Sequence, residues 1–233
     1  MYEAQSVVDA ITRCFEDGTY SDLIIKCRNR SWNVHRLIVC SQSKVLHAAC
    51  MTGFKEADTG VIELNDDDPV SVEIMLKYFY AGTYDEQIIE GKELRLNLKV
   101  QVLTYNLADK YNVPNLMGLL KRKFESTLNA GPALEEFLSV VSDVYIIPTS
   151  TNILRPITVE YARRKFRSMI QSDDLEILRA TLQDVPAFAF DILQLFINDP
   201  LRGYCHNCGS DKSAEVLQAR CVGCGKGGVS KIF

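Results

Sequence analysis

The order of apolar and turn-forming stretches between residues 21 and 82 constrains the fold more than any other feature of this sequence. Asp22 to Cys27 is rich in Ile and Leu and predicts a buried strand. Arg28 to Ser31 is polar and turn-like, and Trp32 to Val34 continues as a second strand that extends toward Leu37. The pattern therefore predicts a hairpin of two short strands.

Further helix and strand signals follow this hairpin closely. Ser43 can cap a short helix from Lys44 to Met51, and Val61 to Leu64 predicts another strand. Asp66 to Pro69 starts a longer helix, because an Asp cap and a proline suit the first helical turn. That helix is expected to end at Gly82. Its buried stripe consists of Val72, Met75, Leu76 and Phe79.

Helical periodicity dominates the chain after a polar stretch at residues 85–95, which is predicted to be a loop. Apolar residues from Leu96 onward repeat at heptad-like spacing and predict a helix that ends near Asn112. Alternation between Leu94 and Val102 leaves an extended start open. Asn129 to Pro132 marks the best internal boundary. Apolar spacing predicts further helices over residues 116–124, 134–144, 157–170 and 175–182, and one from Pro186 that carries Phe190, Leu193 and Phe196.

Four local patterns in this order are similar to those of BTB/POZ domains, three of them in forms common among fungal members. They are Trp32-Asn33-Val34-His35-Arg36, the stretch Gly53 to Ala57, Asp66 to Pro69, and Leu107 to Tyr111. The resemblance implies an α+β fold, a small sheet with surrounding helices, and a protein-interaction module that is usually dimeric and not a catalyst. The chain departs from the family at Val45-Leu46-His47, where an aromatic residue is usual.

The resemblance and the internal boundary divide the chain into four parts. Residues 1–18 are expected to form an N-terminal amphipathic helix, and residues 19–127 the BTB/POZ domain. Residues 128–200 follow as a helical region, and residues 201–233 as a four-cysteine segment resembling a zinc ribbon.

The first helix is the first candidate interaction element. Its apolar stripe either packs on its own domain or, as in many BTB proteins, crosses to a dimer partner. The candidate residues of this stripe are Val7, Val8, Ile11 and Phe15.

The resemblance adds two further sets of interaction residues. Asp22 and Arg36 occupy the positions of a partly buried charge pair near the family's dimer interface; alternatively, Asp22 ends a turn and Arg36 is solvated. Phe54-Lys55-Glu56 fits the short pattern by which some members bind cullin-3 ubiquitin ligases. The alternative is a core aromatic at Phe54 and a solvated charge at Glu56. The implied partners are a second copy and other proteins, with cullin-3 among the candidates.

The last thirty residues contain a metal-ligand pattern. Cys205-x-x-Cys208 and Cys221-x-x-Cys224 are two pairs that can each hold one side of a tetrahedral zinc ion. Four cysteine ligands leave no open coordination position, so the zinc is expected to be structural. His206 lies between ligands and is interpreted as a bystander. Disulfides or free thiols remain the alternatives.

Composition limits the cell compartments and the classes of binding partner that we expect for this chain. A net charge of −4 gives no overall attraction to nucleic acid or anionic membranes. We see no signal peptide and no apolar run long enough to span a membrane, so we expect a cytoplasmic or nuclear protein. The tail is locally basic, and nucleic-acid contact through it stays open beside a solvated face. Its basic residues are Lys212, Arg220, Lys226 and Lys231.

The sequence gives no support for catalysis. Only three histidines occur, and His35 is interpreted as a structural hydrogen-bonding residue at a strand end. No phosphate-binding loop or dinucleotide fingerprint is present. The acidic run at Asp66 to Asp68 is explained by helix capping. We therefore expect no small-molecule substrate and no catalytic residues.

Overall fold

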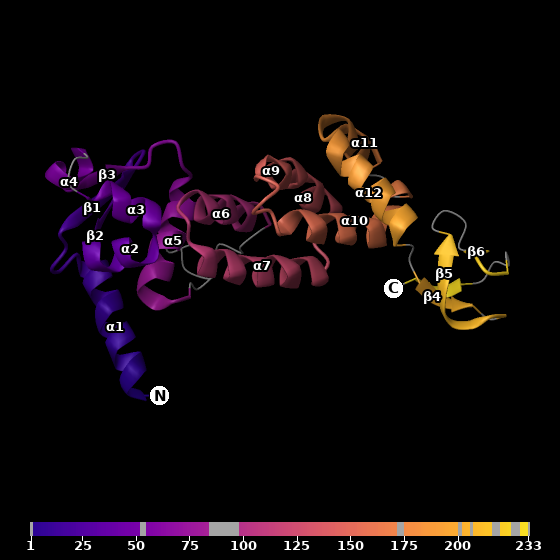
Figure 1. Ribbon diagram of the computed structural model, residues 1–233, viewed down its shortest axis with the longest axis horizontal. Coiled ribbons are helices and arrows are strands. Elements are labelled where there is room, and N and C mark those ends of the chain that lie inside the picture. The colour runs from indigo at the N-terminus through magenta and orange to yellow at the C-terminus, as the bar shows by residue number, and fades with distance from the viewer. Residues whose placement is uncertain are drawn as a thin grey trace. The chain divides into compact units, whose positions relative to one another are not determined.

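The computed structural model describes residues 2–51, 55–83, 98–171, 175–199, 202–205, 207–215, 220–224 and 229–232 (Figure 1). The chain forms two compact units, Met1–Phe124 and Glu125–Phe233. Among the described residues no single helix has the length and apolar composition of a membrane span. The helices α11 (Leu175–Asp184) and α12 (Pro186–Asn198) pass that test only as a pair that is bent by 103°.

The first unit is built on a small mixed sheet with the strand order β2-β1-β3. β1 (Leu23–Cys27) pairs antiparallel with β2 (Arg30–Val34) and parallel with β3 (Val61–Glu63). Leu23, Ile25 and Cys27 are buried while Lys26 is exposed, so one face of β1 lies against the core. The predicted hairpin and the predicted third strand are confirmed.

The second strand does not extend toward Leu37, and this part of the prediction is wrong. Leu37 lies in the helix α2 (Arg36–Gln42). The Asp22 carboxylate accepts a hydrogen bond from the main-chain N–H of Arg36 at 2.7 Å, and so satisfies the first turn of α2. A carboxylate at this end also complements the helix dipole. The helix therefore begins two residues after β2 ends.

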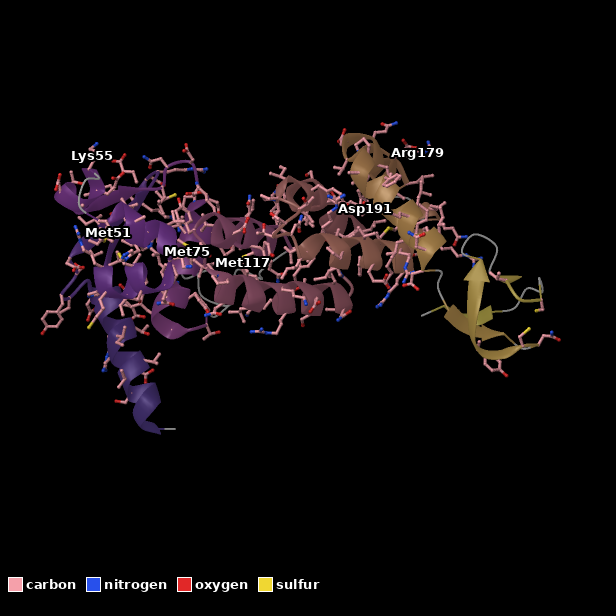
Figure 2. The ribbon with its side chains drawn as sticks, viewed as in Figure 1. Met51, Lys55, Met75, Met117, Arg179 and Asp191 are labelled. Atoms are coloured by element: carbon pink, nitrogen blue, oxygen red, sulfur yellow. The ribbon has the colours of Figure 1, made fainter. Side chains whose placement is uncertain are left out.

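Capping residues set the ends of the next helices. Ser43 caps α3 (Lys44–Ala49) as predicted, and its Oγ accepts from the N–H of Leu46. The short helix α4 (Lys55–Thr59) was not predicted. Asp68 caps α5 (Pro69–Ala81), and Gly82 ends it in the left-handed conformation with φ 68°. Met75 of α5 lies in the interior of this unit (Figure 2).

Two polar contacts join distant parts of the first unit. α6 (Leu98–Lys110) ends two residues earlier than predicted, and Asn112 adopts φ 53° before α7 (Pro114–Asn129). Beside this turn, the Tyr111 hydroxyl donates to the buried Asp67 carboxylate at 2.6 Å. The Ser43 hydroxyl donates to the carbonyl oxygen of Tyr111, also at 2.6 Å. The predicted loop at residues 85–95 lies outside the described residues.

The second unit is helical and then turns into a small sheet. Residues 134–144, predicted as one helix, form two: α8 (Leu134–Ser139) and α9 (Val141–Ile146). The break lies at Val140, whose N–H bonds three residues back, to the carbonyl oxygen of Phe137, and tightens the end of α8. The three later helices are confirmed: α10 (Leu154–Ile170), α11 (Leu175–Asp184) and α12 (Pro186–Asn198).

The tail forms a four-stranded sheet with the order β6-β5-β4-β7. Its strands are β4 (Arg202–Cys205), β5 (Gly209–Glu215), β6 (Arg220–Cys221) and β7 (Val229–Ile232). All of its pairings are antiparallel. The chain thus reverses direction between β5 and β6, which pair through Ala214 and Cys221.

Candidate interaction surface and cysteine tail

The N-terminal helix α1 (Tyr2–Asp17) is anchored at its C-terminal end. Phe15 stacks on Tyr80 of α5, with ring centroids 4.5 Å apart and an interplanar angle of 21°. Val8 and Ile11 are half-buried, whereas Val7 is exposed. Packing on the same chain thus covers the apolar stripe of α1 at Phe15 and leaves it open toward the N-terminus.

Tyr80 also organises a hydrogen-bond network around His35. The His35 Nε2 atom lies 2.8 Å from the carbonyl oxygen of Thr19, which can only accept, so Nε2 carries the proton. Neutral Nδ1 then accepts from the Tyr80 hydroxyl at 2.8 Å, and that hydroxyl accepts from the His35 N–H at 2.9 Å. Burial raises the pKa of Tyr80 to about 12. His35 therefore has a structural role, as the sequence indicates.

Asp22 and Arg36 are brought together by hydrogen bonds to the main chain. The Asp22 carboxylate accepts a hydrogen bond from the Arg36 N–H. The Arg36 guanidinium donates to the carbonyl oxygens of Asp22 at 3.3 Å and of Ala57 at 3.1 Å. Asp22 is exposed and Arg36 is half-buried. The two residues therefore tie together the starts of β1 and α2 and the helix α4.

Two large side chains beside this site are strongly exposed, and sequence reasoning missed both. Tyr20 is 86% exposed and Leu37 is 80% exposed. Tyr20 has φ 64°, so the turn after α1 is left-handed at this residue. From the sequence, Leu37 is expected to continue the strand, because no residue next to it indicates that a helix begins at Arg36. Together with Val7, they form what we call the α1–α2 residues.

The cullin-type pattern is described only in part. Phe54 lies outside the described residues. Glu56 is half-buried in α4, and its carbonyl oxygen accepts the N–H of Gly60 at 3.0 Å. Gly60 has φ 66°, which lets the chain turn directly from α4 into β3.

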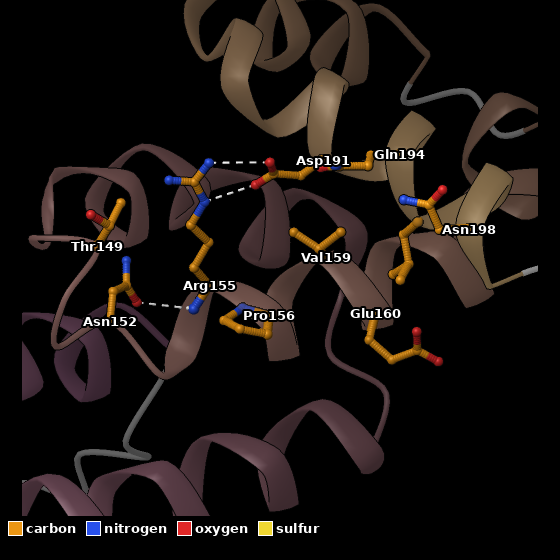
Figure 3. A pocket seen from close by; sticks show the side chains of 10 residues that line it. Thr149, Asn152, Arg155, Pro156, Val159, Glu160, Asp191, Gln194 and Asn198 are labelled. Atoms are coloured by element: carbon orange, nitrogen blue, oxygen red, sulfur yellow. Dashed lines mark hydrogen bonds and ion pairs between the residues drawn. The ribbon is translucent and has the colours of Figure 1, made fainter.

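The second unit contains a pocket of about 710 Å³ between α10 and α12 (Figure 3). Arg155 on its wall makes two hydrogen bonds to the Asp191 carboxylate, at 2.7 and 3.1 Å. Tyr145 of α9 donates to the same carboxylate at 2.5 Å, and the Arg155 guanidinium lies 4.4 Å from the Tyr145 ring centroid. We call these three residues the Asp191 cluster.

The electrostatics of the Asp191 cluster are those of a structural tie. Burial opposes ionisation of Asp191, but hydrogen bonds from Arg155 and Tyr145 outweigh it and lower its pKa. Burial and the bond to Asp191 raise the pKa of Tyr145. The charges compensate one another, so the cluster joins α9, α10 and α12. Arg155 and Asp191 are 36 residues apart, and no local pattern in the sequence could have paired them.

The strand register of the tail places Cys205 and Cys221 opposite the two ends of β5, at Gly209 and Ala214. Cys205 to Cys208 form the turn from β4 to β5, where Cys205 pairs with Gly209. β6 pairs with β5 through Ala214 and Cys221 and runs back toward that turn. β7 lies on the opposite edge and begins opposite Cys205, at Val229. β6 and β7 therefore lie on opposite edges of the sheet.

Among the side chains that the structure describes, no group of three His, Cys, Asp or Glu residues is arranged to hold a metal ion. The side chains of Cys205 and Cys221 are outside that set, while Cys208 and Cys224 are half-buried. The four-cysteine zinc site therefore stays a prediction.

A family model described as BTB/POZ domain matches residues 11–128. The Kelch repeat and BTB domain-containing protein 4 of Homo sapiens is 25% identical over 122 residues, which cover 52% of this chain and 21% of that protein. The Mus musculus protein of the same name gives the same values. The chain thus spans about a fifth of the length of these relatives. The BTB domain of zebrafish PATZ1 aligns with a TM-score of 0.42 at 10% identity, covering 53% of this chain and 92% of that one.

Proposed function

Since this chain belongs to the BTB/POZ domain family, whose domains mediate protein interactions and often dimerise, we propose that it is a homodimerising scaffold or adaptor. In this proposal the first unit makes the dimer, and the helical region and tail present a second binding surface. BTB/POZ domains are typically non-catalytic interaction modules.

The observation that carries the dimer proposal is the exposure of the α1–α2 residues. Tyr20 and Leu37 are each at least four-fifths exposed in a single chain, and Val7 continues the open end of the α1 stripe. Burying a side chain such as Leu is worth about 1.5–3 kcal/mol, so a second copy that covers these residues gains substantially. The half-buried Val8 and Ile11 would be covered in the same contact.

Light scattering on the full chain tests the dimer. We expect twice the 26.3 kDa mass of one chain. Leu37→Glu should shift the equilibrium toward the monomer, because a charge at an apolar contact is costly to desolvate. Ile146→Glu is the matched control: Ile146 is an exposed apolar residue of α9, and its substitution should leave the mass unchanged. A wild-type protein that stays monomeric at high concentration would exclude this function.

Adaptor activity toward cullin-3 is the second candidate, and the helical region from α8 to α12 favours it. Members of the family that act as cullin-3 adaptors would need a helical extension after the BTB/POZ domain. We expect cullin-3 to bind the wild type, and Phe54→Ala and Glu56→Lys each to weaken binding about tenfold or more. Asp58→Lys, an exposed change in the same α4 helix, is the control. Absence of wild-type binding in a titration would remove this candidate and leave the scaffold.

The proposal includes a structural zinc ion in the tail. Cys205, Cys208, Cys221 and Cys224 supply four thiolates, and a tetrahedral four-cysteine site is closed to substrates. The spacing of two residues within each cysteine pair supports it, because two such pairs can complete a tetrahedron of sulfur ligands. A segment this small cannot bury a core of its own, so the metal would supply much of its folding energy. Thiolate ligation fits a reducing compartment, the cytoplasm or nucleus.

A further inference from the structure

The helix α12 has two apolar faces, and the second unit covers only one of them. Phe188 and Ile192 are buried, and Phe196 meets Phe166 of α10 edge to face with centroids 5.6 Å apart. On the opposite face Phe190 is 64% exposed, Leu193 59% and Ile197 77%. Their spacing of three and four residues places these three on one line along the helix, which we call the α12 stripe.

The α12 stripe contains no charged side chain that would favour its exposure to water. Among the thirteen residues of α12 only Asp191 is charged, and it is bound to Arg155 within the unit. The exposed residues that flank the stripe are Pro186, Ala187, Gln194 and Asn198, all uncharged. A helix that is apolar on both sides is typically covered on both sides. The stripe is therefore an apolar surface that the described part of the second unit leaves uncovered.

We propose that the α12 stripe binds the α12 stripe of a second copy of this chain, antiparallel and around a two-fold axis between residues 193 and 194. A two-fold contact brings the same face of both copies together, so it penalises any face that carries net charge. The uncharged stripe avoids this penalty. The register sets Phe190 of one copy opposite Ile197 of the other, with Leu193 of both copies beside the axis.

Charge at the two ends of α12 favours the antiparallel orientation. The first turn of α12 has no side-chain cap, since Val185 stands at the cap position. The Asp199 carboxylate, just past the other end, stays 68% exposed although Arg163 Nη1 lies 3.7 Å away. In the antiparallel pair this carboxylate of one copy lies beside the first turn of the other. A negative charge at the positive end of a helix dipole is stabilising.

The contact is small and is expected to be weak by itself. One helix against one helix buries less than the roughly 1,200 Å² of a standard stable interface. It would gain strength in any assembly that already holds two copies together, because the second contact then forms at high effective concentration. The proposal stands apart from the dimer of the first unit, since it uses none of the α1–α2 residues.

Site-specific photo-crosslinking of the full chain tests the proposal. A benzophenone amino acid at position 194 lies next to the predicted axis and leaves the stripe intact. In a mixture of isotope-labelled and unlabelled copies, we expect a covalent dimer whose two joined peptides both come from α12. Phe190→Glu should lower its yield at least about tenfold, because the register places each new carboxylate against the apolar Ile197 of the other copy, where it would lose its hydration. The control Ile146→Glu should leave the yield unchanged.

Three outcomes would overturn the proposal. One is a lack of any adduct at the highest concentration at which the protein stays soluble. Another is an adduct between position 194 and a segment other than α12, such as α1 or the tail. The third is an α12–α12 adduct whose yield Phe190→Glu leaves unchanged. Since the attachment site is mapped, loss of the first unit's dimer would not be mistaken for any of these.

Discussion

At the scale of single residues, Tyr80 links α1 and His35 to the helix α5. Its ring supports Phe15 of α1, and its hydroxyl satisfies both the main chain and the imidazole of His35. The imidazole in turn holds the carbonyl oxygen of Thr19, at the exit of α1. One buried phenol thus joins three segments that are distant in the sequence.

Tyr80→Phe is expected to lower the free energy of unfolding by about 1–3 kcal/mol, because it leaves the N–H and Nδ1 of His35 without their partner while the stack on Phe15 remains. Denaturant unfolding followed by the fluorescence of Trp32 measures the effect in the first unit. Tyr20→Phe removes a hydroxyl from a residue that is 86% exposed, and serves as the control with no expected change. Equal stability of both variants and the wild type would contradict the network.

Residue roles could be predicted from the sequence where their partners are close along the chain. Ser43 and Asp68 cap the helices that follow them, and each bonds a residue three positions ahead. Asp22 caps α2 from 14 residues away, and nothing in its neighbourhood indicates this. The exposed Leu37 was missed for the same reason, since the start of its helix depends on a distant carboxylate.

At the scale of elements, the Asp191 cluster holds α9, α10 and α12 together. Its pH dependence follows from the lowered pKa of Asp191, which lies below the ordinary value of 3.8. A carboxyl whose pKa is lowered by folding stabilises the fold above its unfolded pKa. The contribution disappears as the pH falls through that value toward the folded one.

Asp191→Asn is therefore expected to reduce the opening free energy of α12 by about 1–3 kcal/mol near neutral pH, and by less below about pH 4. Hydrogen exchange of the α12 amides measures this locally. Asp184→Asn changes an exposed carboxylate at the end of α11, and should have little effect at any pH. A loss in Asp191→Asn that stays constant down to low pH would show that its charge is not the cause.

Most helices and strands could be predicted, and the exceptions are short. Long amphipathic segments such as α10 and strongly capped ones such as α5 carry enough signal by themselves. The five-residue α4 and the seven-residue α2 do not span enough turns to show a period. The two faces of α12 could not be separated either, because apolar residues surround the helix and only packing distinguishes Phe188 from Phe190.

At the scale of the whole molecule, the fold class and the family could be predicted from local motifs, whereas the surfaces could not. The motifs around His35, Asp68 and Tyr111 serve the interior of the first unit, so they indicate a fold. Which apolar residues stay uncovered depends on how the elements pack. For this reason Leu37, Tyr20 and the α12 stripe emerged only from the structure.

Metal removal should separate the tail from the rest of the chain. We expect about one zinc ion per chain, and a strong chelator should abolish hydrogen-exchange protection in β4 to β7 while the first unit keeps its unfolding midpoint. Cys221→Ser should reproduce the loss, because three thiolates bind more weakly than four. Cys14→Ser, in α1, is the control. A protected tail in metal-free protein would contradict the zinc site.

Tyr111 bonds both Asp67 and Ser43, and this has a consequence for how the protein is made. A ribosome must release the chain past Tyr111 before either buried group finds its partner. Until then the core of the nascent N-terminal half is incomplete, and its apolar residues stay accessible to chaperones. A messenger truncated before that codon would yield a product that quality control recognises as unfolded, however complete its strands.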